Sequence, residues 1–122
     1  MCTVLFVDDE ESILKITKIL LSSLNIEVIL ANSGKKAIEI LSDKEYRHKI
    51  NLVLLDLTMP EMNGLDVLQW INNEKITIPI ILQTGIEDGN ELNKAIQLGA
   101  KNYLVKPYSK EKLHQFITNY AK

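Results

Sequence analysis

Residues 52–64 read LVLLDLTMPEMNG, and this stretch decides the fold that we expect. Its first four residues form a continuous apolar run that stops at Asp56, a pattern typical of a buried strand in the middle of a parallel sheet. Residues 59–64 contain Pro60 and the pair Asn63–Gly64, which interrupt regular structure and predict a loop. Apolar residues at helical spacing follow the loop. The stretch therefore predicts one unit of strand, loop and helix.

The same alternation of apolar runs and helical patterns extends along the whole chain. Asn25 and Gly99 are expected to end helices, Asp88 and Glu91 have the spacing of a capping box, and the polar segment 42–51 is expected to be a loop. Further strands are expected at residues 3–7, 26–31, 78–83 and 102–105, and further helices at about 11–24, from 33, around 89–96 and from 109. Five strand–helix units predict an α/β fold, with a doubly wound parallel sheet covered by helices on both faces.

The composition sets limits on function. The 122 residues are enough for one domain, expected over 1–122, with one hydrophobic core. The net charge of -2 gives no electrostatic reason for direct binding to nucleic acid or to a membrane, and no apolar run is long enough to span a bilayer. The lone Cys2 has no partner for an internal disulfide, which fits a cytoplasmic protein.

Polar residues of particular types follow four of the expected strands. Acids at 8–10 follow the first strand and Asp56 closes the third, while Thr84–Gly85 and Lys106–Pro107 follow the fourth and fifth. The carboxyl ends of parallel strands meet at one edge of a sheet, where such folds bind ligands. Clustered carboxylates suit Mg²⁺, and a lysine with a hydroxyl suits an anion. The combination predicts a phosphoryl site bridged to Mg²⁺, with a carboxylate as nucleophile.

Each element taken alone has a simpler interpretation. The acids at 8–10 also favour a helix N-terminus, and Asp56 also suits a turn after a strand. Thr84–Gly85 is a common turn pair, and Lys106 resembles any solvated lysine. The prediction depends on all of these types occurring together in the right order.

In four stretches the sequence resembles the receiver domain of response regulators in two-component signalling. The resemblance covers essentially the whole chain and implies the flavodoxin-like (βα)5 receiver fold with strand order 2-1-3-4-5. It rests on FVDDE at 6–10, LDLTMPEMNG at 55–64, QTG at 83–85 and GAKNYLVKP at 99–107.

The resemblance implies a role for each matching acid. Asp56 corresponds to the residue that accepts the phosphoryl group. Asp8 and Asp9 correspond to the acidic pair that binds Mg²⁺ together with Asp56 and the main-chain carbonyl of Thr58.

It also implies roles for the residues after the last two strands. Lys106 corresponds to the lysine that pairs with the phosphoryl group, and Thr84 to the hydroxyl that moves toward it. Tyr103 corresponds to the aromatic residue of the switch. The peptide bond between Lys106 and Pro107 is expected to be cis.

The function implied is that of a phosphoprotein in a phosphorelay. A sensor histidine kinase or a phosphotransfer protein supplies the phosphoryl group, and the surface of the fourth helix, fifth strand and fifth helix then changes. Such a protein supports its own phosphorylation and dephosphorylation, and is not an enzyme acting on an external substrate. The output is an unknown partner or a fused output domain.

Some positions depart from common patterns of the family. Lys101–Asn102 and Gln115 replace the charged residues of many receivers fused to DNA-binding domains, which weakens the case for a transcription-factor origin. The chain is expected to be either a stand-alone regulator or a piece of a longer one. Thr58 and Ile86 lie where the family tunes hydrolysis, and the apolar Ile86 predicts a long-lived phosphoryl group.

Two other classes of protein fit the sequence less well. An aspartyl phosphatase on a similar sheet normally carries Asp-x-Asp after its first strand, whereas here Asp8 and Asp9 are adjacent. A flavodoxin-like interaction module without phosphorylation would not need the complete set of acids and lysine. No glycine-rich phosphate loop follows the first strand, which argues against a flavin or dinucleotide.

Overall fold

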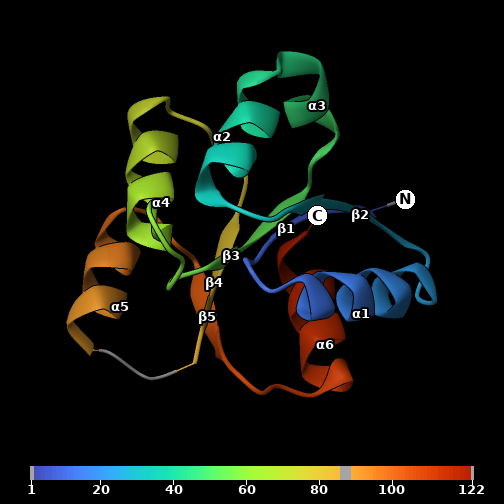
Figure 1. Ribbon diagram of the computed structural model, residues 1–122. Helices are drawn as coiled ribbons and strands as arrows, with labels where there is room; N and C mark the ends of the chain where they lie inside the picture. Colours follow the sequence, from blue (N-terminus) through green and yellow to red (C-terminus); the bar gives the residue numbers. More distant parts are fainter. Residues whose placement is uncertain (1, 86–88, 122) are drawn as a thin grey trace.

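The computed structural model describes residues 2–85 and 89–121. Its strands form one parallel sheet in the order β2-β1-β3-β4-β5, which confirms the expected doubly wound arrangement (Figure 1). The strands are β1 Cys2–Val7, β2 Ile26–Ala31, β3 Leu52–Asp56, β4 Ile80–Thr84 and β5 Asn102–Val105.

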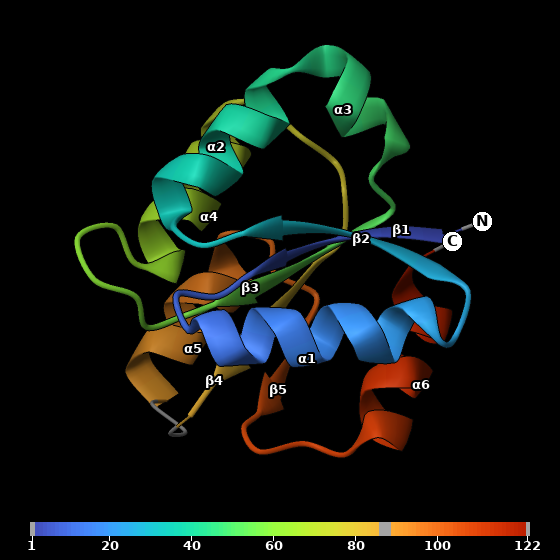
Figure 2. The ribbon, with the colours of Figure 1, turned by 45° about the vertical axis from the view of Figure 1, so that its right-hand side comes forward.

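Helices cover both faces of this sheet. The helices are α1 Glu11–Ser22, α2 Gly34–Ser42, α3 Lys44–Lys49, α4 Gly64–Asn73, α5 Gly89–Gln97 and α6 Lys110–Tyr120. Helices α1 and α6 pack on one face, and α2, α4 and α5 pack on the other (Figures 1 and 2). No helix in the described part of the chain is long and apolar enough to cross a membrane.

Strand alternation explains why two apolar clusters form, one on each face. Successive side chains of a strand point to opposite faces. In β1, Leu5 and Val7 therefore join the cluster beneath α2, α4 and α5, while Val4 and Phe6 join the cluster beneath α1 and α6. All four side chains are fully buried, as expected for a central strand with helices on both sides.

Helix α3 corrects the expectation of a loop over 42–51. The Asp43 side chain accepts hydrogen bonds from the backbone N–H groups of Glu45 and Tyr46, which caps the helix. Basic residues occupy the last turn, where they favour the helix dipole. None of the helix is buried, so it has no apolar face that periodicity would reveal. Because of this extra helix, the surface expected to switch is made by α5, β5 and α6.

The remaining differences concern the ends of elements. Helix α1 ends two residues earlier than expected, and β4 runs over 80–84 instead of 78–83. Asn25 and Gly99 have positive φ angles of 62° and 107°, which confirms both as helix-ending residues. The capping box expected at Asp88 lies outside the described residues.

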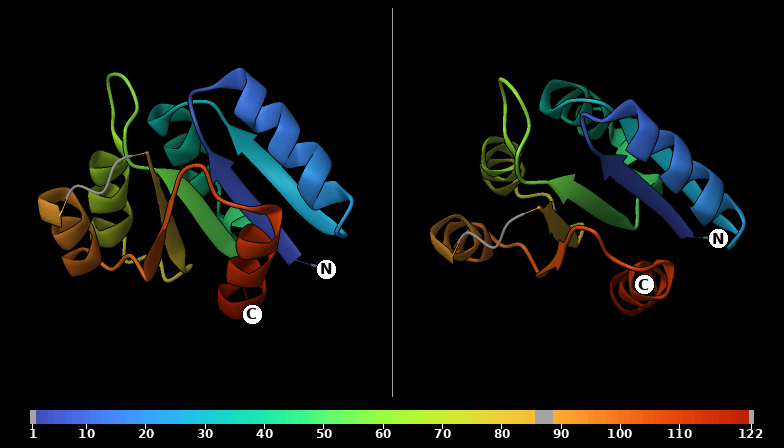
Figure 3. Two further views of the ribbon diagram at one scale, coloured as in Figure 1. Left: turned by 90° about the horizontal axis from the view of Figure 1, so that it is seen from below. Right: turned by 60° about the horizontal axis from the view of Figure 1, so that its bottom comes forward.

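The strands all point toward the same edge of the sheet (Figure 3). The loops that follow β1, β3, β4 and β5 therefore gather at one end of the molecule. Gly64 allows the loop after β3 to return closely, because a Cβ there would lie 2.6 Å from the Asp56 carbonyl oxygen. The Gly64 N–H donates to the Leu57 carbonyl at 2.9 Å, which fixes that loop against the end of β3.

Candidate functional site

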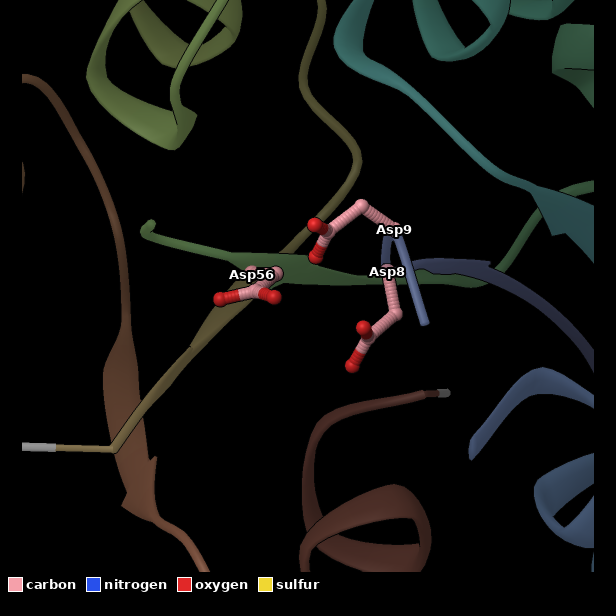
Figure 4. Close-up of side chains that lie close together, drawn as sticks. All are labelled: Asp8, Asp9 and Asp56. Carbon is pink, nitrogen blue, oxygen red and sulfur yellow. The ribbon is translucent and has the colours of Figure 1, made fainter. Parts of the chain in front are cut away.

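Three aspartates meet at the carboxyl ends of the two central strands. Val7 of β1 is in register with Leu55 of β3, so Asp8 lies beside Asp56. One carboxylate oxygen each from Asp8, Asp9 and Asp56 lies within 4.8 Å of the others (Figure 4). Asp8 is fully buried, Asp56 is 4% exposed and Asp9 is exposed, so the cluster extends from the interior to solvent.

Hydrogen bonds fix the two buried carboxylates. The backbone N–H of Glu10 donates to Asp8 Oδ1 at 3.0 Å, and that of Thr58 donates to Asp56 Oδ1 at 3.1 Å. Lys106 Nζ donates to Asp8 Oδ2 at 2.9 Å and to Asp56 Oδ2 at 3.3 Å. The lysine therefore bridges the two acids.

The environment shifts the pKa of both Asp56 and Lys106. Burial raises the pKa of Asp56, and the charge of Asp8 raises it further, which together outweigh the lowering by Lys106 and by the Thr58 N–H. Burial alone would lower the pKa of Lys106, but its hydrogen bond to Asp8 and the charges of both acids raise it. Lys106 is therefore a cation at neutral pH, and it offsets only part of the negative charge.

The donor set fits Mg²⁺. Carboxylate oxygens are the hard ligands that this ion takes, and Mg²⁺ commonly uses one or two of them and keeps several waters. Asp9 and the cleft beside it leave room for water, while three acids facing one lysine leave net negative charge. The described residues thus provide the chemistry expected of a magnesium site, with Asp8, Asp9 and Asp56 as candidate ligands.

A cleft of about 440 Å³ opens beside the cluster. Its lining includes Asp9, Asp56, Thr58, Thr84 and Lys106, all of which were singled out from the sequence. The structure therefore brings together the residues that follow β1, β3, β4 and β5.

Tyr103 and Thr84 lie on the opposite face of the sheet from Asp8 and Asp56. Leu82 pairs with Tyr103 and Thr84 with Val105, so Thr84 and Tyr103 share the face of the sheet that α5 covers. Tyr103 is half-buried and lies outside the described lining of the cleft. The Lys106–Pro107 peptide bond is cis, as the resemblance implied. Ile86, expected to limit access of water, lies outside the described residues.

Two features of the site were not foreseen from the sequence. Glu91, interpreted only as part of a cap, lines the cleft together with Glu10. Gln83, immediately before Thr84, is fully buried and accepts a hydrogen bond from the Tyr108 hydroxyl. Gln83 is a polar residue at the end of an apolar run, which could have marked it as part of the site. Nothing in the sequence pairs it with Tyr108.

Comparison with known proteins gives a consistent result. Residues 4–118 match the family described as the response regulator receiver domain. A probable transcriptional regulator, ycf27, from Porphyridium aerugineum is 38% identical over 114 residues, covering 93% of this chain and 45% of that protein. The response regulator SaeR of Staphylococcus aureus is 34% identical over 119 residues, covering 98% of this chain and 50% of SaeR. The chain thus spans about half the length of these relatives.

Solved structures share the fold over nearly the whole chain. A response regulator receiver domain protein from Clostridium thermocellum superposes with a TM-score of 0.90 at 31% identity, covering 99% of this chain and 94% of that one. The chemotaxis protein CheY4 of Vibrio cholerae superposes with a TM-score of 0.86 at 25% identity, covering 98% of each chain.

Proposed function

Because this chain belongs to the response regulator receiver domain family, we propose that it accepts a phosphoryl group on Asp56 in a two-component phosphorelay. The observation that carries the proposal is the bridge of Lys106 Nζ between Asp8 and Asp56 at the edge of an open cleft. Of the two acids that Lys106 contacts, only Asp56 is described as lining the cleft. Asp56 is therefore the bridged acid that an incoming group reaches.

The reaction is a phosphoryl transfer from a phosphohistidine of a partner kinase or phosphotransfer protein. An Asp56 carboxylate oxygen forms a bond to phosphorus as the P–N bond breaks, and the donor imidazole keeps the electron pair and takes up a proton. The Thr58 N–H holds Oδ1 of Asp56 in a fixed orientation for the attack. Lys106 lies where it offsets charge on the phosphoryl oxygens.

Asp8, Asp9 and Asp56 would hold Mg²⁺, joined in this proposal by the main-chain carbonyl of Thr58. When bound, the ion supplies charge neutralisation for the phosphoryl oxygens. Lys106 alone cannot do this, because among the described residues it is the one cation paired with the cluster, and the cluster holds three carboxylates. The acids of this chain thus both bind the ion and orient the accepting oxygen.

The proposed switch runs from Thr84 to Tyr103. The two residues share one face of the sheet, and Thr84 lines the cleft. Movement of the Thr84 hydroxyl toward a new phosphoryl oxygen would vacate space on that face, which Tyr103 can fill. The surface made by α5, β5 and α6 would change as a result.

The protein is then a phosphorylated switch and not a catalyst acting on an external substrate. Its own acyl phosphate is hydrolysed, which resets the site. The protein acts in the cytoplasm, a sensor histidine kinase or a phosphotransfer protein is the donor, and an unknown partner or fused domain reads the α5-β5-α6 surface. Lys101–Asn102 and Gln115 weaken the case for a transcription-factor origin, but one longer relative is named as a probable transcriptional regulator, so transcriptional control by a longer protein is one output to test.

The direct test is incubation with acetyl phosphate and Mg²⁺, followed by intact-mass measurement of the protein beside Asp56→Asn. We expect the wild type to gain the mass of one phosphoryl group and the variant to gain none. An equal gain in the variant would overturn the assignment of Asp56.

The wild type and Asp56→Asn also test the alternative function, that of an aspartyl phosphatase. Labelling that stops at one phosphoryl group per chain supports the receiver function. Sustained turnover of a generic phosphate ester, abolished by Asp56→Asn, would support the enzyme instead. Absence of labelling with every donor would favour an interaction module that is not phosphorylated.

A further inference from the structure

A buried glutamine lies beside the phosphoacceptor on the neighbouring strand. Gln83 of β4 is in register with Asp56 of β3 and with Leu104 of β5. Residues in register on adjacent parallel strands point to the same face, so Gln83 continues the row that Asp8 and Asp56 begin. The next residue of β4 on that face, Ile81, is apolar and fully buried, as is Leu104. Gln83 is thus an uncharged polar side chain buried between the acids and an apolar core.

Among the described residues, the Gln83 side chain has one hydrogen-bond partner. The Tyr108 hydroxyl donates to Gln83 Oε1 at 2.6 Å. Burial raises the pKa of Tyr108, and the charges of Asp8 and Asp56 raise it further, so the hydroxyl keeps its proton and remains a donor. The hydrogen bond therefore connects the segment after β5 to the strand next to Asp56.

Two hydrogen bonds hold the segment that carries Lys106 against β4. The Lys106 N–H donates to the Thr84 carbonyl at 2.7 Å, and Tyr108, two residues later, donates to Gln83. Both acceptors are consecutive residues of β4, and both donors flank Pro107. The start of the Lys106 side chain is thus fixed on both sides, while its Nζ reaches Asp8 and Asp56.

The pair is not the arrangement that stability alone would favour. Within the part of the chain that the structure describes, the Gln83 Nε2 atom is buried without a hydrogen-bond partner. A buried unpaired donor is unfavourable, whereas replacing both members of a polar pair by apolar groups of similar shape can be neutral or stabilising. Leucine at 83 with phenylalanine at 108 would match the apolar residues nearby. Packing alone therefore does not explain why this pair is polar.

We propose that Gln83 and Tyr108 are positioning residues, which fix Lys106 at the place where it meets a phosphoryl group on Asp56. This inference rests on the proposed function, because Lys106 needs accurate placement only if Asp56 is phosphorylated. The hydrogen bond sets the position of the Lys106 main chain, and Nζ then bridges the acids without searching other orientations.

The test uses Gln83→Leu combined with Tyr108→Phe, which removes both polar groups, so that neither side chain keeps a buried polar atom without a partner. Its matched control is Tyr120→Phe, which also removes a tyrosine hydroxyl. The Tyr120 hydroxyl accepts a hydrogen bond from Asn102 Nδ2 at 3.0 Å, and Tyr120 lies outside the described lining of the cleft. The measurements are urea unfolding, the rate of phosphorylation at increasing acetyl phosphate, and the Nζ chemical shift of Lys106 by NMR, with the signal assigned through Lys106→Arg.

For the double variant we expect unchanged or higher stability, a maximal phosphorylation rate about tenfold lower, and a displaced Lys106 signal. The control should retain the wild-type rate and signal. A stable double variant with the wild-type rate and Lys106 signal would overturn the inference. If the double variant fails to fold, Tyr108→Phe alone is measured. A lower rate with a displaced Lys106 signal then supports the inference, and the wild-type rate and signal overturn it.

The two hypotheses fail in distinguishable ways. If the wild type takes up no phosphoryl group, the proposed function fails. The Lys106 signal then still decides the positioning role, because an unmoved signal in the folded double variant contradicts it whatever the labelling result.

Discussion

The two ends of the central strands β1 and β3 handle polar groups in opposite ways. At the amino end, the Asn51 N–H donates to the Thr3 carbonyl at 2.8 Å, and the Thr3 N–H donates to Asn51 Oδ1 at 2.8 Å. At the carboxyl end, the same strands bring together the like charges of Asp8 and Asp56, with Lys106 between them. One end is closed by a reciprocal pair, and the other gathers charge beside a cleft.

The difference shows that repulsion between like charges occurs at the carboxyl end of these strands. The amino end contributes to stability through neutral hydrogen bonds that need no ligand. The carboxyl end has carboxylates close enough to repel, and burial raises the pKa of Asp56 against ionisation. Such a site is relieved by binding a cation or by losing a charge, and functional sites commonly carry perturbed groups of this kind. Substitutions at the two ends should therefore respond differently to Mg²⁺ and to pH.

The largest expected effect is that of Gly64→Ala, which tests how tightly the carboxyl end is packed. The new Cβ would meet the Asp56 carbonyl oxygen at 2.6 Å and the Leu57 Cα at 2.7 Å, both backbone atoms that cannot rotate away. We expect the free energy of unfolding in urea to fall by about 3 kcal/mol. Gly89→Ala is the matched control, since its Cβ would meet no atom of the described residues within 4 Å. Equal stability of the two variants would contradict this picture of the loop after β3.

Lys106→Met should have the next largest effect. It leaves the fully buried Asp8 without its cation, so we expect a loss of about 2 kcal/mol at neutral pH. Mg²⁺ should recover part of the loss, because it supplies positive charge at the same acids. Thermal unfolding with and without Mg²⁺ measures this. A loss that Mg²⁺ leaves untouched would mean that packing of the lysine stem, and not its charge, stabilises this end.

Asn51→Ala tests the amino end. The Thr3 N–H would lose its acceptor, and we expect the free energy of unfolding to fall by about 1 kcal/mol. Because the cluster of acids found among the described residues lies at the carboxyl end, the loss should be the same with and without Mg²⁺. A loss that depends on Mg²⁺ would remove the proposed contrast between the ends.

Asp56→Asn should have an effect as small as that of Asn51→Ala, with the opposite sign. Burial raises the folded-state pKa of Asp56 above its ordinary value of 3.8, so its ionisation lowers the stability of the wild type as pH rises from that value through the folded pKa. Asparagine avoids this loss. We expect the variant to be more stable by about 1 kcal/mol near pH 7, and the difference to vanish near pH 3. Urea unfolding across this range measures it, and a difference independent of pH would exclude ionisation as its cause.

Much of the fold was predictable because its core follows simple periodicities. The apolar runs of β1 and β3 predicted buried strands, and Asn25 and Gly99 correctly marked helix ends. Helix α3 was missed because its stability comes from the Asp43 cap and its charges, with no buried face to produce a period.

The site was predictable only as far as topology brings strand ends together. Asp8, Asp56 and Lys106 follow their strands directly, so the parallel sheet alone makes them neighbours. The hydrogen bond between Gln83 and Tyr108 joins two side chains that are 25 residues apart in sequence. No local sequence pattern predicts such a contact.

The central claim is that Asp56 itself carries the phosphoryl group, and the most direct measurement identifies the modified residue. Borohydride reduces an aspartyl phosphate to homoserine, which peptide mass spectrometry locates after digestion of the protein labelled with acetyl phosphate and Mg²⁺. We expect homoserine at position 56 alone. Homoserine at position 8 or 9 would contradict the account, as would a phosphoryl group retained on one of the chain's two histidines, His48 and His114.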